Sequence, residues 1–292
     1  MSKCLVCKSN NTKVFKSKVA KFLSIRMLNG EEQETDAVFC KDCGFLYYTF
    51  RPTDEQMNKL YYRYRDEEYQ KQRQSCECWY TPKINELIGN SLSEKETRNK
   101  NLENIINKNI EIENINNVLD FGGDKGQHIP NIFSKKEKYV YDISGVEPIA
   151  GVNFTDLKDK SKKFDFVMCC HLLEHVCSPQ QIIEQIKSLM SNESYLYIEL
   201  PFDSPFYANK FEIFQFLFNK YFTFPTLLKH FIKTKSEKCF KPMHEHINFF
   251  TPQSITKLLE DFGFEILYND IFIINSEWCK TKTISTLAKY KH

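Results

Sequence analysis

The sequence lacks long apolar runs and any excess of one charge. No stretch approaches the roughly 18 uncharged apolar residues of a membrane-spanning helix. With 40 basic and 38 acidic residues the net charge is +2, which gives no reason to expect a nucleic-acid partner. The first residues also lack the basic, apolar and small-residue pattern of a secretory signal. We therefore expect a cytoplasmic protein without a membrane span that acts on a small or neutral molecule.

Glycine is scarce, yet three of the 9 glycines lie within Val118 to Gly126, VLDFGGDKG. An apolar pair that leads into an acid and a glycine-rich turn is typical of a buried parallel strand that ends where a helix begins. Glycine permits positive φ there and lets backbone N–H groups and the helix N-terminus approach a ligand. The candidate cofactor-binding residues of this stretch are Asp120, Phe121, Gly122, Gly123 and Gly126.

Further strands follow along the chain. Lys138 to Tyr141 ends in Asp142, whose carboxylate can accept both hydroxyls of a ribose. Asp156 follows the expected strand Gly151 to Phe154 and is either an adenine contact or an ordinary loop aspartate. Two more strands, 164–170 and 195–201, flank a segment, 180–190, with apolar residues at helical spacing. This alternation predicts a doubly wound α/β sheet.

In this order the elements resemble a class I S-adenosylmethionine-dependent methyltransferase. Asp120-x-Gly122 with Gly126 resembles its first motif, Asp142 its ribose-binding acid, and Leu173-Glu174-His175-Val176 its post-sheet segment. The family commonly has a glycine at the position of Asp124, which sugar-modifying members often lack. The resemblance implies a Rossmann-like domain with a mostly parallel seven-stranded sheet and S-adenosylmethionine as cofactor. Cys170 and His171 are further candidates on the cofactor side, although His171 also suits a structural role.

Two cysteine pairs, Cys4-x-x-Cys7 and Cys40-x-x-Cys43, predict a second site. A two-residue gap lets both thiolates of a pair face one ion, and two pairs supply the four ligands of a closed tetrahedral zinc site. Such a site has no open position, so we expect the zinc to be structural and to take no part in the reaction.

The expected organisation has three parts. Residues 1–65 form a zinc-binding module with a tyrosine-rich segment, residues 66–116 a helical connector, and residues 117–292 the methyltransferase domain. Within that domain the aromatic stretch 203–240 is an insertion. It suits a lid over the acceptor site or a subunit contact within a homodimer better than a membrane-surface helix.

The segment His244-Glu245-His246 offers acid–base or metal-binding groups. On a strand both histidines would share one face, as could suit a metal. No third ligand is evident nearby, so acid–base work is the better interpretation.

Here the chain resembles more closely the sugar methyltransferases that act on nucleotide-linked or surface-glycan sugars. Those proteins combine a zinc module of two Cys-x-x-Cys pairs, a tyrosine-rich segment and a Glu-His pair before an aromatic stretch. The likeness implies that Glu245, His246 and His175 line the acceptor site, with Tyr61 and Tyr64 as weaker candidates.

For the reaction we predict transfer of a methyl group to a sugar hydroxyl, with His246 as general base held by Glu245 and His175 as the second choice. Carbon-methylating relatives have a further carboxy-terminal domain, whereas this chain stops about 20 residues after its last expected strand. We therefore expect oxygen, and not carbon, to be methylated. The alternatives are carbon methylation of a sugar, methylation of RNA, and a scaffold that binds the cofactor without turnover.

Overall fold

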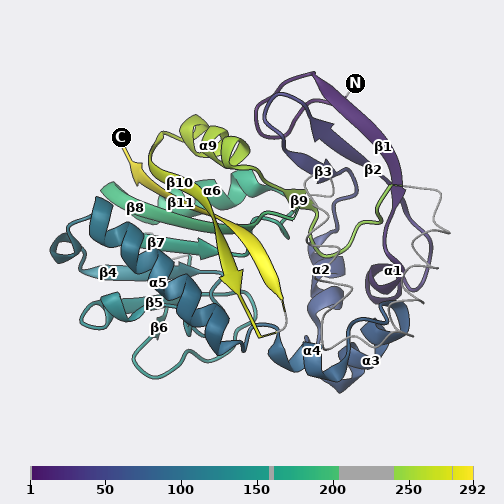
Figure 1. The fold of residues 1–292 in the computed structure, drawn as a ribbon, viewed down its shortest axis with the longest axis horizontal. Helices are drawn as coiled ribbons and strands as arrows, with labels where there is room; N and C mark the ends of the chain where they lie inside the picture. Colours follow the sequence, from purple (N-terminus) through teal and green to yellow (C-terminus); the bar gives the residue numbers. More distant parts are fainter. Residues whose placement is uncertain (1, 158–160, 204–239, 278, 292) are drawn as a thin grey trace.

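The computed structural model describes residues 2–157, 161–203, 240–277 and 279–291, which form two β-sheets with helices packed on them (Figure 1). The larger sheet has seven strands in the order β10-β11-β8-β7-β4-β5-β6. Five neighbouring strands run parallel, namely β4 (Asn117–Phe121), β5 (Glu137–Tyr141), β6 (Asn153–Phe154), β7 (Phe164–Cys170) and β8 (Met190–Pro201). The predicted Rossmann-like, mostly parallel seven-stranded sheet is therefore confirmed.

The remaining two strands of this sheet are β10 (Phe264–Asn275) and β11 (Lys280–Tyr290). β11 inserts between β8 and β10 and runs antiparallel to both. The sequence analysis identified no strand over Lys280–Tyr290, because the strand is rich in threonine, serine and lysine. In the structure Thr283 and Ser285 are buried all the same, and the Ser285 hydroxyl accepts a hydrogen bond from Asn101 and donates one to the Tyr197 hydroxyl.

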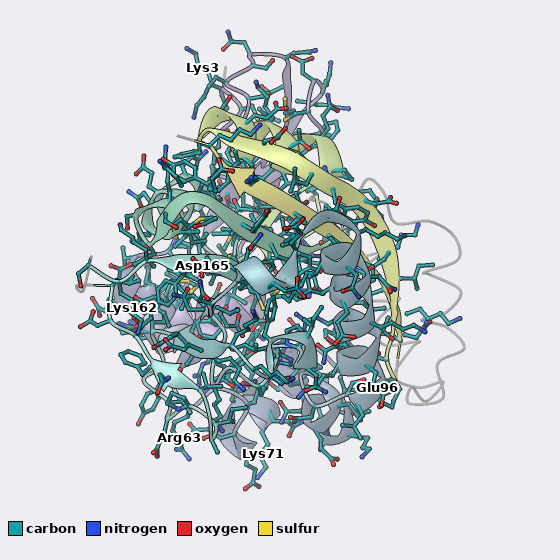
Figure 2. The ribbon with its side chains drawn as sticks, turned by 90° about the vertical axis from the view of Figure 1, so that its left-hand side faces the viewer. Lys3, Arg63, Lys71, Glu96, Lys162 and Asp165 are labelled. Atoms are coloured by element: carbon teal, nitrogen blue, oxygen red, sulfur yellow. The ribbon has the colours of Figure 1, made fainter. Side chains whose placement is uncertain are left out.

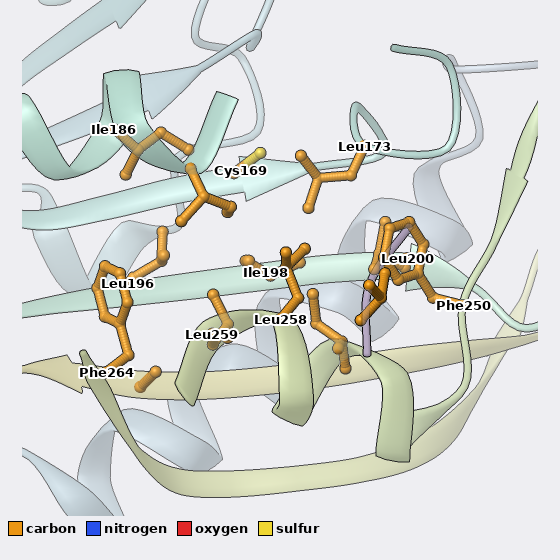
Figure 3. Packing of buried hydrophobic residues seen from close by; sticks show 14 of the residues in the cluster. Cys169, Leu173, Ile186, Leu196, Ile198, Leu200, Phe250, Leu258, Leu259 and Phe264 are labelled. Atoms are coloured by element: carbon orange, nitrogen blue, oxygen red, sulfur yellow. The ribbon is translucent and has the colours of Figure 1, made fainter. Parts of the chain in front are cut away.

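Helices cover both faces of the large sheet. Residues alternate along each strand, so Val167 and Cys169 of β7 face one core cluster while Phe166 and Met168 face another. The first cluster lies under α6 (Pro179–Ser188) and α9 (Pro252–Asp261), and Figure 3 shows residues of these helices beside the side chains of β8. The second cluster lies under α5 (Leu92–Asn109), which is followed by the short η1 (Ile112–Asn114).

The helix expected directly after the glycine-rich turn is absent from the described residues. Turns occupy the chain after β4, and the short 3-10 helix η2 (Asn131–Phe133) follows them. The physical reason lies in the backbone: Gly122, Asp124 and Gly126 have φ of 78°, 54° and 75°, a left-handed conformation that a right-handed helix cannot contain. Pro130 then directly precedes η2.

The smaller sheet has the order β1-β2-β3-β9. Its strands are β1 (Thr12–Lys18), β2 (Glu34–Cys40), β3 (Leu46–Tyr48) and β9 (Asn248–Phe249), so a strand from late in the chain completes a sheet built from its beginning. Beside it lie α1 (Lys21–Met27), α2 (Asp54–Tyr61), α3 (Glu67–Cys76) and α4 (Pro82–Leu87). Thr53 caps α2 through a capping box with Gln56.

The surface carries both signs of charge: in Figure 2 the labelled Lys3 lies at the top of the molecule, Arg63 and Lys71 lie at its lower edge, and Glu96 lies at the lower right. Among the described residues no helix is both long enough and apolar enough to cross a bilayer. Nearly all of the predicted aromatic insertion, 204–239, lies outside the described residues.

Candidate active site and metal centre

The glycine-rich turn forms a tight cradle around one carboxyl group. Asp120 lies in β4 with 2% of its surface exposed, and its Oδ2 has no hydrogen-bond partner among the described residues. A Cβ on Gly123 would lie 2.2 Å from that oxygen, so only glycine leaves room for the carboxyl group. Burial raises the pKa of Asp120 to about 7. A buried carboxyl oxygen of this kind needs a donor from outside the described residues.

Asp142 follows β5 directly, at the carboxyl edge of the sheet beside this turn. Its Oδ2 accepts a hydrogen bond from the backbone N–H of Asp124 at 3.0 Å, and its Oδ1 accepts one from Ser144 at 2.8 Å. These two bonds hold the carboxylate in place. Each oxygen retains a lone pair for a further donor.

Gly122 and Gly126 fit closely against neighbouring loops. A Cβ on Gly122 would lie 2.9 Å from Leu172, and one on Gly126 would lie 2.8 Å from Val152. Phe121 is buried and packs on Tyr141 with ring centroids 5.0 Å apart. The turn therefore contacts the segment that follows β7, where His175 lies.

The remaining candidates on the cofactor side differ in their surroundings. Asp156 is exposed, two residues beyond β6. Cys170 ends β7 in a partly buried position, and burial raises the pKa of its thiol well above the usual range. The imidazole of His171 lies between two buried carboxylates, with Nδ1 3.4 Å from Glu174 Oε1 and Nε2 3.5 Å from Glu199 Oε1. Burial alone would lower the pKa of His171, but these two carboxylates raise it to about 9.

Glu199 has a second cationic partner. Arg98 of α5 donates to its Oε1 at 2.8 Å, and this buried charge holds the pKa of Glu199 at about 2 despite the opposing effect of burial. Arg98, Glu199 and His128 line a cavity of about 10 Å³, enough for one water molecule. Burial lowers the pKa of His128 to about 4, so this imidazole is neutral at physiological pH. The ion pair ties the connector helix to the sheet.

A second group of side chains gathers where the two sheets meet. Nδ1 of His175 lies 3.0 Å from the backbone oxygen of Glu245, and the rings of His175 and His246 are 4.8 Å apart. The hydroxyl of Tyr61 lies 3.4 Å from the same Nδ1. The structure thus brings together three of the predicted acceptor-site side chains. Tyr64 packs edge-on against Tyr61, at 5.3 Å between ring centroids.

Glu245 does not hold His246, contrary to the prediction. Nδ1 of His246 instead pairs with Oδ2 of Asp203 at 2.8 Å. Glu245 turns the other way: it accepts a hydrogen bond from Tyr69 at 2.6 Å and pairs with Arg73 at 3.0 Å. Burial works to raise the pKa of Glu245, but Arg73 and the Tyr69 hydroxyl hold it below its ordinary value.

The two histidines of the His244-Glu245-His246 segment pair with different carboxylates. The segment lies outside any strand, and β9 begins only at Asn248. Nδ1 of His244 pairs with Glu77 at 2.9 Å, away from the partner of His246. The alternative in which both histidines share one face of a strand, as could suit a metal, is therefore wrong.

The sequence did not identify several side chains at the site as functional, namely Asp203, Glu174, Tyr69, Arg73, Arg98 and Glu199. For Glu174 a signal was available, because it directly precedes His175 in the post-sheet motif. The others pair across long stretches of chain: Tyr69 and Glu245 are separated by 176 positions. Spacing along a sequence does not reveal such pairs.

The four predicted zinc ligands form one cluster. Sγ of Cys4 lies 3.6 Å from that of Cys43, and Sγ of Cys7 lies 3.5 Å from that of Cys40. Four thiolates about 2.3 Å from a tetrahedral zinc ion would be about 3.8 Å apart, so the cluster fits this ion closely. Three of the four cysteines are buried, and the cluster belongs to the same hydrophobic core as the large sheet. Zinc would serve here as a structural cross-link.

Comparison with known families identifies the larger domain. The sequence profile of a family described as "Methyltransferase domain" matches residues 69–269, more than half of the chain. The chain belongs to this methyltransferase family. The resemblance to class I S-adenosylmethionine-dependent methyltransferases is thus confirmed for family and fold, while the likeness to sugar-modifying members stays a prediction. No curated protein matches the chain.

Solved structures of methyltransferases are similar to the chain at low sequence identity. Magnesium protoporphyrin IX methyltransferase from Synechocystis PCC 6803, with bound SAH, is 15% identical over 68% of this chain and 84% of its own, with a TM-score of 0.43. The N-methyltransferase NodS from Bradyrhizobium japonicum WM9, in complex with SAH, is 10% identical over 68% and 87%, with a TM-score of 0.41.

Proposed function

We propose that this methyltransferase transfers a methyl group from S-adenosylmethionine to a hydroxyl of a nucleotide-linked or surface-glycan sugar. The observation that carries the proposal is the imidazole–carboxylate pair of His246 and Asp203 beside His175 and Tyr61. A carboxylate can only accept, so Nδ1 of His246 carries the proton and Nε2 is left to accept one. This is the arrangement that a general base for a hydroxyl needs.

The cofactor side supports the same proposal. The Oδ2 of Asp120 is buried without a hydrogen-bond partner among the described residues, in a cradle that a Cβ would fill, and Asp142 directly follows the next strand. Ile143, directly after Asp142, is 83% exposed, and a flat apolar base could cover it. These residues fit an adenosine with a cationic amino acid attached. When bound, S-adenosylmethionine supplies a reactive methyl group and a good leaving group.

One short turn links the cofactor-binding residues to the acceptor-site histidines. Leu172 touches Gly122 of the cofactor turn, and the backbone N–H of His175 donates to Leu172 at 3.0 Å. An acceptor held by the imidazoles would therefore lie at the same edge of the sheet as the cofactor. The protein would contribute alignment of the acceptor oxygen and removal of its proton, the latter worth roughly a hundred- to ten-thousand-fold.

The test is turnover of labelled S-adenosylmethionine with a panel of nucleotide-activated hexoses and heptoses. We expect His246→Ala to reduce kcat at least about a hundredfold while the Kd of the cofactor stays unchanged. His244→Ala is the matched control, because His244 pairs with Glu77 and not with the group formed by His175, His246, Asp203 and Tyr61. An alkali-stable ether in the product would assign the oxygen. Cofactor binding without methylation of any sugar, or equal losses in both variants, would contradict the proposal.

A further inference from the structure

Three side chains at the proposed acceptor site have the composition of a metal site. Glu174, His175 and His246 each offer a ligand atom, and the three atoms lie within 4.8 Å of one another. The distance from Nε2 of His175 to Oε1 of Glu174 is 3.8 Å. Zinc bound at about 2.1 Å would bring such atoms to roughly 3.4 Å apart, which small side-chain rotations can achieve.

Glu174 is the member whose surroundings need an explanation. The residue is 1% exposed, and neither carboxylate oxygen accepts a hydrogen bond from the described residues. Its nearest cationic neighbour, Nδ1 of His171, lies 3.4 Å away from Oε1 alone. The protonated His171 faces only Oε1, so Oε2 stays buried without a donor among the described residues, which is costly unless a proton donor or a cation fills the space in front of it.

Both histidines are already fixed in the orientation that metal ligation requires. Nδ1 of His175 faces the backbone oxygen of Glu245 at 3.0 Å, and Nδ1 of His246 faces a carboxylate oxygen of Asp203 at 2.8 Å. Each of those oxygens can only accept, so each Nδ1 carries the proton and each Nε2 keeps its lone pair. Metal-binding histidines generally donate their other N–H to a carbonyl or carboxylate in this way.

We infer that Glu174, His175 and His246 form a binding site for a divalent transition-metal ion of the zinc type. Two imidazoles and one carboxylate supply three ligands and leave a further position for water. Nε2 of His246 cannot bind an ion and accept a proton at once. If the proposed function holds, the bound ion therefore blocks the base and inhibits methyl transfer in competition with the acceptor.

The test counts zinc in the full-length protein after equilibrium dialysis against buffered zinc. We expect wild type and His244→Gln to hold one more ion per chain than Glu174→Gln and His246→Gln. The cysteine cluster is common to all four proteins, so its occupancy cancels in the comparison. Asp203→Asn, which alters only the partner of His246, should weaken the additional site about 10- to 100-fold. Equal zinc content in all four proteins would overturn the inference.

The readout does not depend on turnover, and His246 is partly exposed, so its variant should fold even if Glu174→Gln does not. If no sugar is methylated but the ion count differs as expected, the metal site stands and the proposed function fails. The reverse result, methylation with no difference in zinc, leaves the proposed function intact and removes the site. Added zinc that lowers turnover without competing with the acceptor would also contradict the inference.

Discussion

The raised pKa of Asp120 makes the stability of the cofactor-free protein depend on pH in a way that one substitution removes. Burial raises this pKa from 3.8 to about 7. At roughly 1.4 kcal/mol per pKa unit, ionising the side chain costs the folded chain about 4 kcal/mol. The neutral isostere in Asp120→Asn avoids that cost at every pH.

The direction of the effect follows from where the proton is held. Between pH 3.8 and about 7 the folded chain keeps a proton on Asp120 that the unfolded chain has released. The free energy of unfolding therefore falls as the pH rises, because the folded state binds more protons than the unfolded one. The stabilisation is fully present below pH 3.8 and is lost as the pH rises through about 7. Between about pH 5 and pH 8 the loss amounts to roughly 2 to 3 kcal/mol.

The assay is urea unfolding of wild type and Asp120→Asn at several pH values without cofactor. All other titrating groups are shared and cancel in the difference between the two proteins. We expect the free energy of unfolding of Asp120→Asn, measured relative to that of wild type, to increase by roughly 2 to 3 kcal/mol as the pH is raised from about 5 to about 8. The same variant should bind S-adenosylmethionine more weakly at pH 8, because it presents no negative charge to the cationic cofactor. Parallel stability profiles for the two proteins would refute the assignment of a buried, proton-holding Asp120.

Two further perturbations test the cradle and the cysteine cluster. Gly123→Ala places a Cβ 2.2 Å from Oδ2 of Asp120, so we expect calorimetry to show at least tenfold weaker cofactor binding. Gly30→Ala, at a glycine with positive φ and open space around it, should leave that binding unchanged. Cys40→Ser should remove the bound zinc and lower the melting temperature by roughly 5 to 10 °C, whereas Cys279→Ser, outside the cluster, should keep the ion. A Cys40→Ser protein with undiminished zinc content would contradict the four-thiolate site.

Sequence patterns predicted those parts of the fold that depend on local order. Apolar runs that end in Asp120 and Asp142 correctly marked β4 and β5, because buried parallel strands are apolar and their ends carry polar groups. The Thr53-x-x-Gln56 capping pattern at the start of α2 is likewise local, because its bonds join residues three positions apart. Failures came where tertiary context decides. β11 was missed because its buried face contains threonine and serine, and the helix after β4 is replaced by left-handed turns.

The candidate site shows the same division. Sequence motifs identified His175 and His246, and the structure places their rings 4.8 Å apart. The partner of His246 was not predictable, because Asp203 lies 43 positions before it, at the start of the aromatic insertion. The adjacency of Glu245 and His246 in the sequence led to the wrong prediction that Glu245 holds His246, because the two side chains bind different partners. Neighbouring side chains outside a helix commonly face opposite ways.

A single stretch of chain explains why a structural zinc site and an acceptor site would occur together. Directly after His246, the backbone N–H of Ile247 donates to the Glu174 carbonyl at 2.8 Å, and Asn248 donates to Leu173 and Val176. β9 then pairs with β3, and Thr251 donates to the Cys43 carbonyl at 2.7 Å. The cysteine cluster, the turn that carries His175 and the segment that carries His246 therefore share one hydrogen-bonded frame. An ion that fixes the cysteines would therefore also fix the spacing of the two imidazoles.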